Sequence, residues 1–353
     1  MEKSDIIGLS KEELFAALER LGEKPFRAKQ LWQWLYFRGA RSFDEMTNLS
    51  KDLRLKLTKH FVLERPKIIT EQISKDKTHK WLLEFADGER VETVYIPEAD
   101  RGAVCISTQV GCLMGCKFCH TGSQKLTRNL TAGEIVSQFM VARDSYHEWP
   151  SPSDTTRFLS NIVVMGMGEP LQNKENVIKA LNILSDGEGI AISRRRITMS
   201  TCGIVPEINP VLEQTGVRLA ISLHASNDAI RTSLMPINKV YNINQIIKAC
   251  QEYQSKDGSR YITFEYLMLD GINDGVQNAR ELIDLLKKNR IRASFNLIPF
   301  NPWPGCEFKP SKPENIKKFA ELLSKAGFAC PVRVARGQDI SAACGQLKSK
   351  HNT

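Results

Sequence analysis

The chain has 353 residues, 42% of them hydrophobic and 25% charged, and it carries a formal net charge of +9. This is the composition of an ordinary soluble globular protein, and the basic surplus is compatible with a polyanionic partner such as a nucleic acid. No apolar stretch approaches the roughly 18–20 residues of a membrane helix, and no secretory segment follows Met1. We therefore expect a cytoplasmic protein with no membrane partner.

Helices followed by strands are predicted for the first hundred residues. Ser10 and Glu13 form a capping-box pattern ahead of leucines at helical spacing, and Lys24 and Ser50 begin two further helical segments. Alternating hydrophobicity then predicts strands at residues 67–73, 80–85 and 90–96. We accordingly predict an N-terminal helical accessory domain at 1–65 and a β-hairpin extension at 66–100 that leads into the core.

From about residue 101 the pattern becomes strand, loop, helix. Short apolar segments predict strands at residues 103–109, 161–165, 196–200, 217–223, 261–268, 294–298 and 331–334. Helical segments separate them, and this alternation implies an α/β core at 101–347 around a parallel sheet of barrel or open-barrel size. In such folds the chemistry lies at the carboxyl ends of the strands.

Nine cysteines are present, which is many for a cytoplasmic chain. Their number is odd and four fall between residues 105 and 119, so a disulfide framework explains them poorly. Metal or redox chemistry explains them better.

The most informative segment holds Cys112, Cys116 and Cys119 at C-x3-C-x2-C spacing. Three thiolates from one short loop can hold a [4Fe–4S] cluster and leave one iron open to a cofactor. A zinc site that also uses His120 is the competing interpretation. Because adjacent residues rarely chelate one tetrahedral ion, the cluster is favoured.

The three-cysteine loop and further blocks along the chain resemble the radical S-adenosylmethionine (SAM) superfamily. Within it, the sequence is similar to the RNA adenine methyltransferases of the RlmN/Cfr type. The matching blocks, in order, lie at residues 91–97, 105–112, 128–131, 166–171, 222–225, 235–238, 269–274, 299–302 and 342–347. The resemblance implies a partial (β/α)6-type radical SAM barrel with an N-terminal accessory region.

The resemblance also assigns roles to particular residues. Cys112, Cys116 and Cys119 would bind the cluster, Cys344 would become methylated, Cys105 would be the second catalytic cysteine, and Glu92 would accept a proton. SAM would be held by Gly168, Glu169, Ser200, Ser222, Leu223, His224 and Asn301.

Residue chemistry is consistent with several of these roles. Glycine at 168 lets the backbone approach a ligand, and Glu169 can accept from the cofactor's ammonium group. The small neighbours of Cys344 leave room for a substituent on its sulfur. Taken alone, His224 would be read as a satisfied structural histidine and Glu92 as a solvated side chain.

Carbon 2 of adenine is electron-poor, so it does not attack the methyl group of SAM directly. The resemblance implies a two-stage route that uses two SAM molecules per turnover. Cys344 first takes a methyl group, and a deoxyadenosyl radical then removes hydrogen from it so that the carbon adds to the ring. Attack by Cys105 on the Cys344 sulfur would release the product and leave a disulfide. The implied partners are 23S ribosomal RNA, some transfer RNAs and a reductant such as flavodoxin, but not DNA.

Other interpretations stay open at this point. A radical methylthiotransferase shares the loop but carries further upstream cysteines, whereas here only Cys105 precedes Cys112. A zinc-stabilised RNA-binding protein is a non-enzymatic alternative. A sister branch of the family methylates carbon 8 instead of carbon 2, and Gln338 departs from the acidic residue that we associate with its place.

Overall fold

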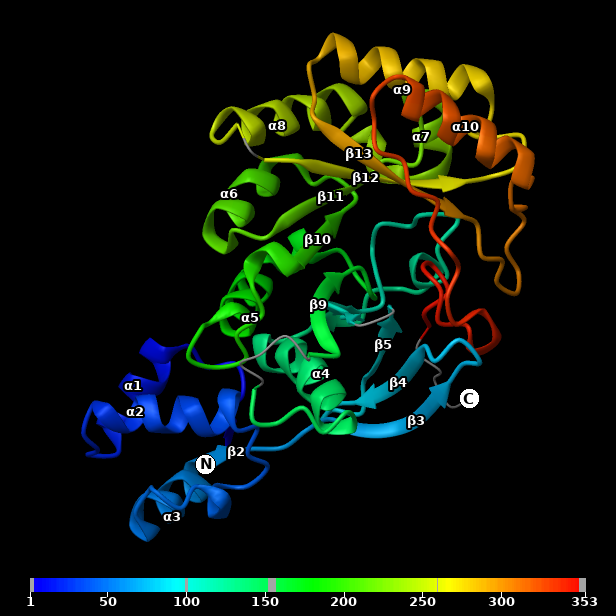
Figure 1. The fold of residues 1–353 in the computed structure, drawn as a ribbon. Helices are drawn as coiled ribbons and strands as arrows, with labels where there is room; N and C mark the ends of the chain where they lie inside the picture. Colours follow the sequence, from blue (N-terminus) through cyan, green and yellow to red (C-terminus); the bar gives the residue numbers. More distant parts are fainter. Residues whose placement is uncertain (1–2, 99–100, 152–156, 259, 349–353) are drawn as a thin grey trace.

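A mixed sheet organises the computed structural model, which describes residues 3–98, 101–151, 157–258 and 260–348; over these residues the sheet has nine strands (Figure 1). Its parallel part runs in chain order from one edge to the middle. The parallel strands are β6 (Gly102–Cys105), β9 (Leu159–Val164), β10 (Ile197–Thr201), β11 (Arg218–Ser222), β12 (Ile262–Met268) and β13 (Ala293–Pro299).

Helices connect successive parallel strands, one more helix follows β13, and together they cover one face of the sheet (Figure 1). They are α4 (Ala132–Ser145), α5 (Lys174–Ser185), α6 (Val205–Thr215), α7 (Asp228–Leu234), α8 (Ile243–Ser255), α9 (Val276–Lys288) and α10 (Pro313–Lys325). Each repeated strand–helix unit buries the strand beneath its helix, which is the construction of a (β/α) barrel. The predicted α/β class and the partial (β/α)6-type barrel are confirmed.

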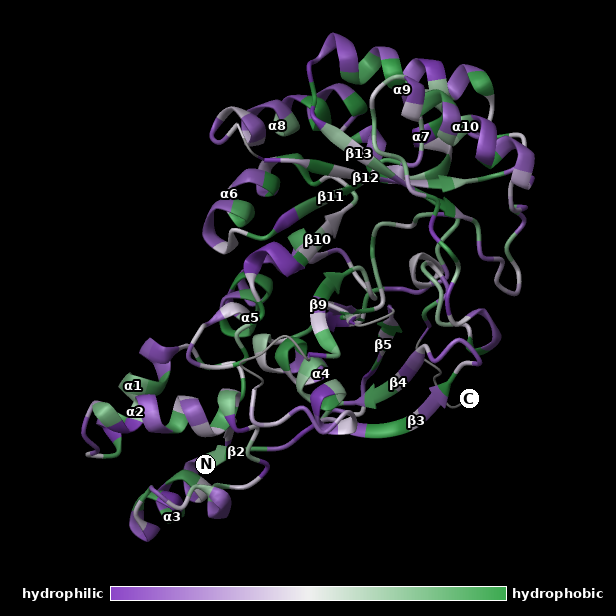
Figure 2. Ribbon diagram, in the orientation of Figure 1, coloured by the Kyte–Doolittle hydropathy of each residue, from purple (hydrophilic) through white to green (hydrophobic). Residues whose placement is uncertain are grey.

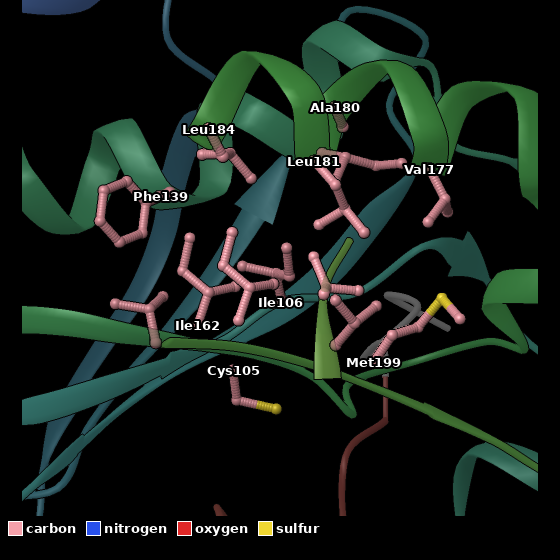
Figure 3. Packing of buried hydrophobic residues seen from close by; sticks show 14 of the residues in the cluster. Cys105, Ile106, Phe139, Ile162, Val177, Ala180, Leu181, Leu184 and Met199 are labelled. Carbon is pink, nitrogen blue, oxygen red and sulfur yellow. The ribbon is translucent and has the colours of Figure 1, made fainter. Parts of the chain in front are cut away.

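The hydrophobic pattern explains this layering. The parallel strands are largely apolar, whereas the outer helices alternate apolar and polar faces (Figure 2). In α9 the buried residues are Ala279, Leu282 and Leu286, which share one helical face. Ile106, Ile162 and Leu181 pack in the layer between the sheet and helices α4 and α5 (Figure 3).

Three antiparallel strands extend the sheet beyond β6. They are β3 (Lys67–Ile73), β4 (His79–Glu84) and β5 (Arg90–Pro97), and β5 pairs with β6 so that Val94 lies opposite Cys105. The strands predicted at residues 67–73, 80–85 and 90–96 are therefore confirmed. They place one face of the hairpin beside the carboxyl end of β6.

The N-terminal part contains α1 (Lys11–Arg20), α2 (Phe26–Trp32) and α3 (Lys51–His60), and the short strands β1 (Ser4–Asp5) and β2 (Phe61–Val62) pair in parallel. The capping box of Ser10 and Glu13 forms as predicted. These helices lie away from β12 and β13 and next to α4 and α5 (Figure 1). Gly8 is in close contact with Gly133 of α4, where a Cβ atom on Gly8 would lie 2.2 Å from the Gly133 nitrogen.

Two expectations about the core were wrong. The strand expected at 103–109 ends at Cys105, because the amide of Ser107 bonds to the side chain of Gln138 instead of to β9. The chain resumes as β7 (Gln109–Val110), which pairs with β8 (Arg128–Asn129). Residues 331–334 make only an isolated bridge between Val332 and Leu297.

Helices α6 and α7 were missed. Two prolines weaken the helical pattern of α6: Pro206 lies in the first turn, where the missing amide hydrogen costs nothing, and Pro210 lies inside the helix. Helix α7 has only seven residues and therefore a weak periodic signal. Among the described residues no helix is long and apolar enough to span a membrane.

Candidate active site

The residues predicted to bind SAM lie at or just beyond the carboxyl ends of the parallel strands. Ser200 is the last residue but one of β10. Ser222 ends β11, and Leu223 and His224 follow it directly. Gly168 and Glu169 follow β9, and Asn301 follows β13. Because the strands are parallel, these positions share one edge of the sheet, where the hydroxyls of Ser200 and Ser222 are 3.3 Å apart.

Glu169 is a buried carboxylate with donors on both oxygens. The Thr201 hydroxyl and the Leu171 amide donate to Oε1 at 2.7 and 3.1 Å, and the Cys202 amide donates to Oε2 at 2.8 Å. Burial raises the pKa of Glu169, and these donors oppose the shift. Oε1 already accepts two of these hydrogen bonds, so a further donor such as a cation would be accepted at Oε2.

Gly168 brings the backbone against Gln109, whose side-chain oxygen accepts from the Glu169 amide at 2.8 Å. At Gly168 φ is +99°, and a Cβ atom would lie 2.5 Å from Cβ of Gln109. Glycine is therefore required both by the backbone conformation and by the close approach.

We expect Gly168→Ala to lower the free energy of unfolding by about 1–3 kcal/mol and to weaken SAM binding, because the strained turn carries Glu169. Urea unfolding and calorimetric titration with SAM measure the two effects. Gly187→Ala is the matched control, since a Cβ there meets no atom within 4 Å. Equal stability of the two variants would contradict the required role of Gly168.

His224 is held by contacts on its backbone and on its ring. Its φ is +56°, its carbonyl accepts from Asn273 at 2.8 Å, and its Nδ1 accepts from the Leu267 amide at 3.0 Å. Burial lowers the pKa of His224 to about 3, so the ring is neutral at ordinary pH and carries its proton on Nε2. Gln338, the residue that departs from the family pattern, donates to Oδ1 of buried Asn301 at 2.9 Å.

The three cysteines of the loop at residues 112–119 pack against one small apolar cluster that includes Met114 and Phe118. Burial is the main cause that raises the pKa of Cys112 to about 12, and the nearby Cys119 thiol adds to it. The pKa of Cys116 is raised in the same way by burial and by both other thiols. Without a cation these sulfurs are thiols, and a metal would replace their protons.

This donor set fits an iron–sulfur cluster, because three cysteine thiolates from one loop can hold a [4Fe–4S] cube and leave one iron open to a cofactor. His120 does not turn toward the thiols; its ring instead stacks on Trp303, with centroids 4.6 Å apart.

Cys105 and Cys344 come from distant parts of the chain but influence each other. Cys105 ends β6, and its sulfur points away from the layer of Ile106 and Ile162, toward the opposite face of the sheet (Figure 3). Burial raises the pKa of Cys105, and the Cys344 thiol raises it further. Electrostatic influence of this kind requires the two sulfurs to be near each other.

Cys344 is exposed to solvent, yet protein atoms surround it. That crowding raises the pKa of Cys344, the neighbouring Glu265 and Cys119 raise it too, and Arg333 lowers it. Cys344 therefore has Cys105 and the cysteine loop as neighbours while it remains open to a substrate.

Glu92 is buried, which corrects the interpretation of it as a solvated side chain. Its Oε1 lies 2.9 Å from Nζ of buried Lys80, and its Oε2 accepts from the Lys348 amide at 2.7 Å. Lys80 also donates to the Ser341 carbonyl at 3.3 Å. The pair thus ties the hairpin to the segment that carries Cys344.

Sequence reasoning missed several residues that support the site. Thr201 and Gln109 orient Glu169, and Glu265 is a buried carboxylate bonded to Asn296 at 2.8 Å. Lys80 could have been found. A hairpin turn at residues 87–88 sets a register in which Lys80 and Glu92 are diagonal neighbours on one face.

A three-cysteine loop at the carboxyl end of a partial parallel barrel defines the class of radical SAM proteins. Residues 106–286 match the radical SAM superfamily, and residues 4–63 match the N-terminal domain of ribosomal RNA large subunit methyltransferases. A crystal structure of a radical SAM methyltransferase from Sphaerobacter thermophilus is 43% identical, with a TM-score of 0.91, over 98% of this chain and 100% of that one.

Curated relatives are still more similar. The dual-specificity RNA methyltransferase RlmN of Gluconobacter oxydans is 56% identical, and its alignment covers 99% of this chain and 86% of the relative. That of Paramagnetospirillum magneticum is 57% identical over 99% of this chain and 76% of the relative. The chain belongs to the RlmN family of radical SAM methyltransferases. It is an enzyme, and its family implies SAM and a [4Fe–4S] cluster.

Proposed function

We propose that the protein methylates carbon 2 of adenosine in 23S ribosomal RNA and in some transfer RNAs. The relatives named as dual-specificity RNA methyltransferases support RNA as the substrate. The placement of Cys344, an accessible thiol with Cys105 and the cysteine loop as neighbours, carries the proposal. A methyl carrier needs access to both a substrate and a radical source, and Cys344 has this position.

The cofactors have fitting donors in this chain. Cys112, Cys116 and Cys119 would hold the cluster, and Glu169 would accept from the ammonium group of SAM, with Ser200, Ser222, Leu223, His224 and Asn301 around the rest of it. When bound, the cluster and SAM would supply one-electron chemistry, including hydrogen-atom removal from an unreactive methyl group and an acceptor for the electron released later.

Cys344 performs the first stage. Its thiolate attacks the methyl carbon of one SAM, so that a sulfur–carbon bond forms, the sulfonium–methyl bond breaks and S-adenosylhomocysteine leaves. Arg333 favours the thiolate because it lowers the pKa of Cys344. A second SAM is consumed when one hydrogen atom is removed from this S-methyl group. The resulting carbon on the Cys344 sulfur then bonds to carbon 2 of the adenine.

Glu92 and Cys105 act in the second stage. Glu92, a buried carboxyl group paired with Lys80, would take the proton that leaves carbon 2. The Cys105 thiolate then attacks the Cys344 sulfur, so that an S–S bond forms and the C–S bond to the RNA breaks. The electron pair of the broken bond stays on the methylene carbon, which takes up a proton and becomes the methyl group. Together these steps release one proton and one electron. The two cysteines end as a disulfide, which a reductant such as flavodoxin must return to thiols with two electrons.

Isotope loss from the adenine ring tests the position of methylation. The reconstituted enzyme is given RNA deuterated at carbon 2 or at carbon 8 of adenosine, and the methylated nucleoside is analysed by mass spectrometry. The proposal predicts that only the carbon-2 deuterium is lost, with both a 23S ribosomal RNA fragment and transfer RNA. Loss of the carbon-8 deuterium would place the protein in the sister branch. A colourless zinc protein with no methylated product would show an RNA-binding protein instead.

A further inference from the structure

The segment that carries Cys344 is bonded directly to the loop that carries the cluster cysteines. The amide of His120 donates to the Gly345 carbonyl at 2.7 Å, and the Thr121 hydroxyl donates to the Leu347 carbonyl at 2.7 Å. Nδ1 of His120 lies 3.3 Å from the Gln346 carbonyl, which can only accept, so the ring donates there. The residue directly after Cys119, His120, is therefore hydrogen-bonded to the residue directly after Cys344, Gly345.

Trp303, in the loop after β13, joins the same set. Its ring stacks on His120 with an interplanar angle of 6°, and its Nε1 donates to the Phe118 carbonyl at 3.0 Å. Gln346 completes the connection: its Nε2 donates to the Pro302 carbonyl at 2.9 Å, and its Oε1 accepts from the Ala343 amide at 3.2 Å.

A second attachment holds the start of the same segment, on the side of the hairpin. Ser74 donates to Asp339 at 2.5 Å, and Asp76 accepts from the Gly337 amide at 3.0 Å. These bonds lie several residues before Cys344, and Lys80 and Glu92 add bonds from the hairpin to the Ser341 carbonyl and the Lys348 amide. The contacts of Gly345 and Gln346 lie directly after Cys344 and, unlike the attachments to the hairpin, they join the segment to the cysteine loop, so they relate Cys344 most directly to the cluster ligands.

We propose that His120, Trp303 and Gln346 form a latch that positions the Cys344 sulfur relative to the cysteine loop. They are positioning residues, because they act through Cys344 and the loop. The proposal rests on the proposed function, since a latch of this kind matters only if Cys344 carries the methyl group. Hydrogen-atom removal requires contact between the reacting atoms, and a displacement of about 1 Å costs on the order of 100-fold in rate.

The test separates coupling from folding. Three variants are purified with Cys344 already methylated: Trp303→Ala, His120→Ala and Gln346→Glu. The last of them keeps the size of the side chain but loses the Nε2 donor. Iron and sulfide content, methylation of Cys344, 5′-deoxyadenosine and methylated adenosine are then measured in a single turnover. We expect the cluster and the methylated Cys344 to be retained. Methylated adenosine formed per 5′-deoxyadenosine should fall by about 10-fold or more, and Trp303→Phe, which keeps the stacking, should restore much of it.

Tyr261→Ala is the matched control. Like Trp303, Tyr261 is a partly exposed aromatic residue that donates to one carbonyl, that of Ala293 at 2.7 Å, but it precedes β12 at the opposite ends of the strands. Its yield of methylated adenosine per 5′-deoxyadenosine should equal that of the wild type. The latch would be overturned if every latch variant lost the cluster, 5′-deoxyadenosine and methylated adenosine in proportion. The yield of methylated adenosine per 5′-deoxyadenosine would then be unchanged. If wild-type Cys344 carries no methyl group, the proposed function fails first and the latch fails with it.

Discussion

Cys116→Ala will lack iron–sulfur absorption and all methylation activity, because the two remaining thiolates cannot hold a [4Fe–4S] cube with one iron open. Cys116 lies between the other two cysteines in the sequence of the loop, and both of their thiols raise the pKa of Cys116 in addition to burial. Visible absorption, iron and sulfide analysis, and methyl transfer to RNA measure the effect, after anaerobic reconstitution.

Cys330→Ala is the control for this variant, because Cys330 lies outside the loop and beyond β13. It should keep a full cluster and wild-type activity. Wild-type activity of Cys116→Ala would show that the cysteine loop takes no part in the reaction, and it would contradict the radical route.

Cys105→Ala should stall as a covalent adduct between protein and RNA. In the proposed route every step up to carbon–carbon bond formation uses Cys344 and the cofactors, and Cys105 acts only at release. Without it, the methylene bridge between the Cys344 sulfur and the adenine has no thiol to break it. We expect product release to fall by several orders of magnitude, because removal of a catalytic nucleophile can cost about 10⁶-fold in rate.

A denaturing gel with and without ribonuclease detects the adduct, and mass analysis of the Cys344 peptide identifies it. Cys250→Ala is the matched control, since Cys250 is a buried thiol on α8, away from the strand ends. Full turnover by Cys105→Ala would reject the two-cysteine mechanism. Absence of any ribonuclease-sensitive band, while Cys344 stays methylated, would show that Cys105 is not the resolving thiol.

Local features of the site could be predicted from the sequence because they depend on neighbours in the chain. The spacing of Cys112, Cys116 and Cys119 within one loop is such a feature, as is the turn at Gly168 that carries Glu169. The position of these residues at the carboxyl ends of strands followed from the alternation of strands and helices. For this reason the candidate site residues lie at the edge of the sheet where the sequence predicted them, at the carboxyl ends of the strands.

Features that depend on long-range contacts could not be predicted. Glu92 was read as solvated, but its burial comes from the Lys348 amide, 256 positions along the chain. The contacts of His120 with Gln346 span 226 positions, and no local pattern encodes them. The early end of β6 has the same origin, because Gln138 of α4 takes the Ser107 amide from the sheet.

A deuterium count in the product tests most directly whether the methyl group passes through Cys344. The enzyme is charged with SAM bearing a trideuterated methyl group, freed of excess cofactor, and allowed one turnover on RNA with unlabelled SAM. The account predicts label on the Cys344 peptide before turnover. Afterwards, the methylated adenosine should carry two of the three deuteriums and 5′-deoxyadenosine the third. A product methyl group with no deuterium, from protein whose Cys344 was labelled, would show that Cys344 is not the carrier.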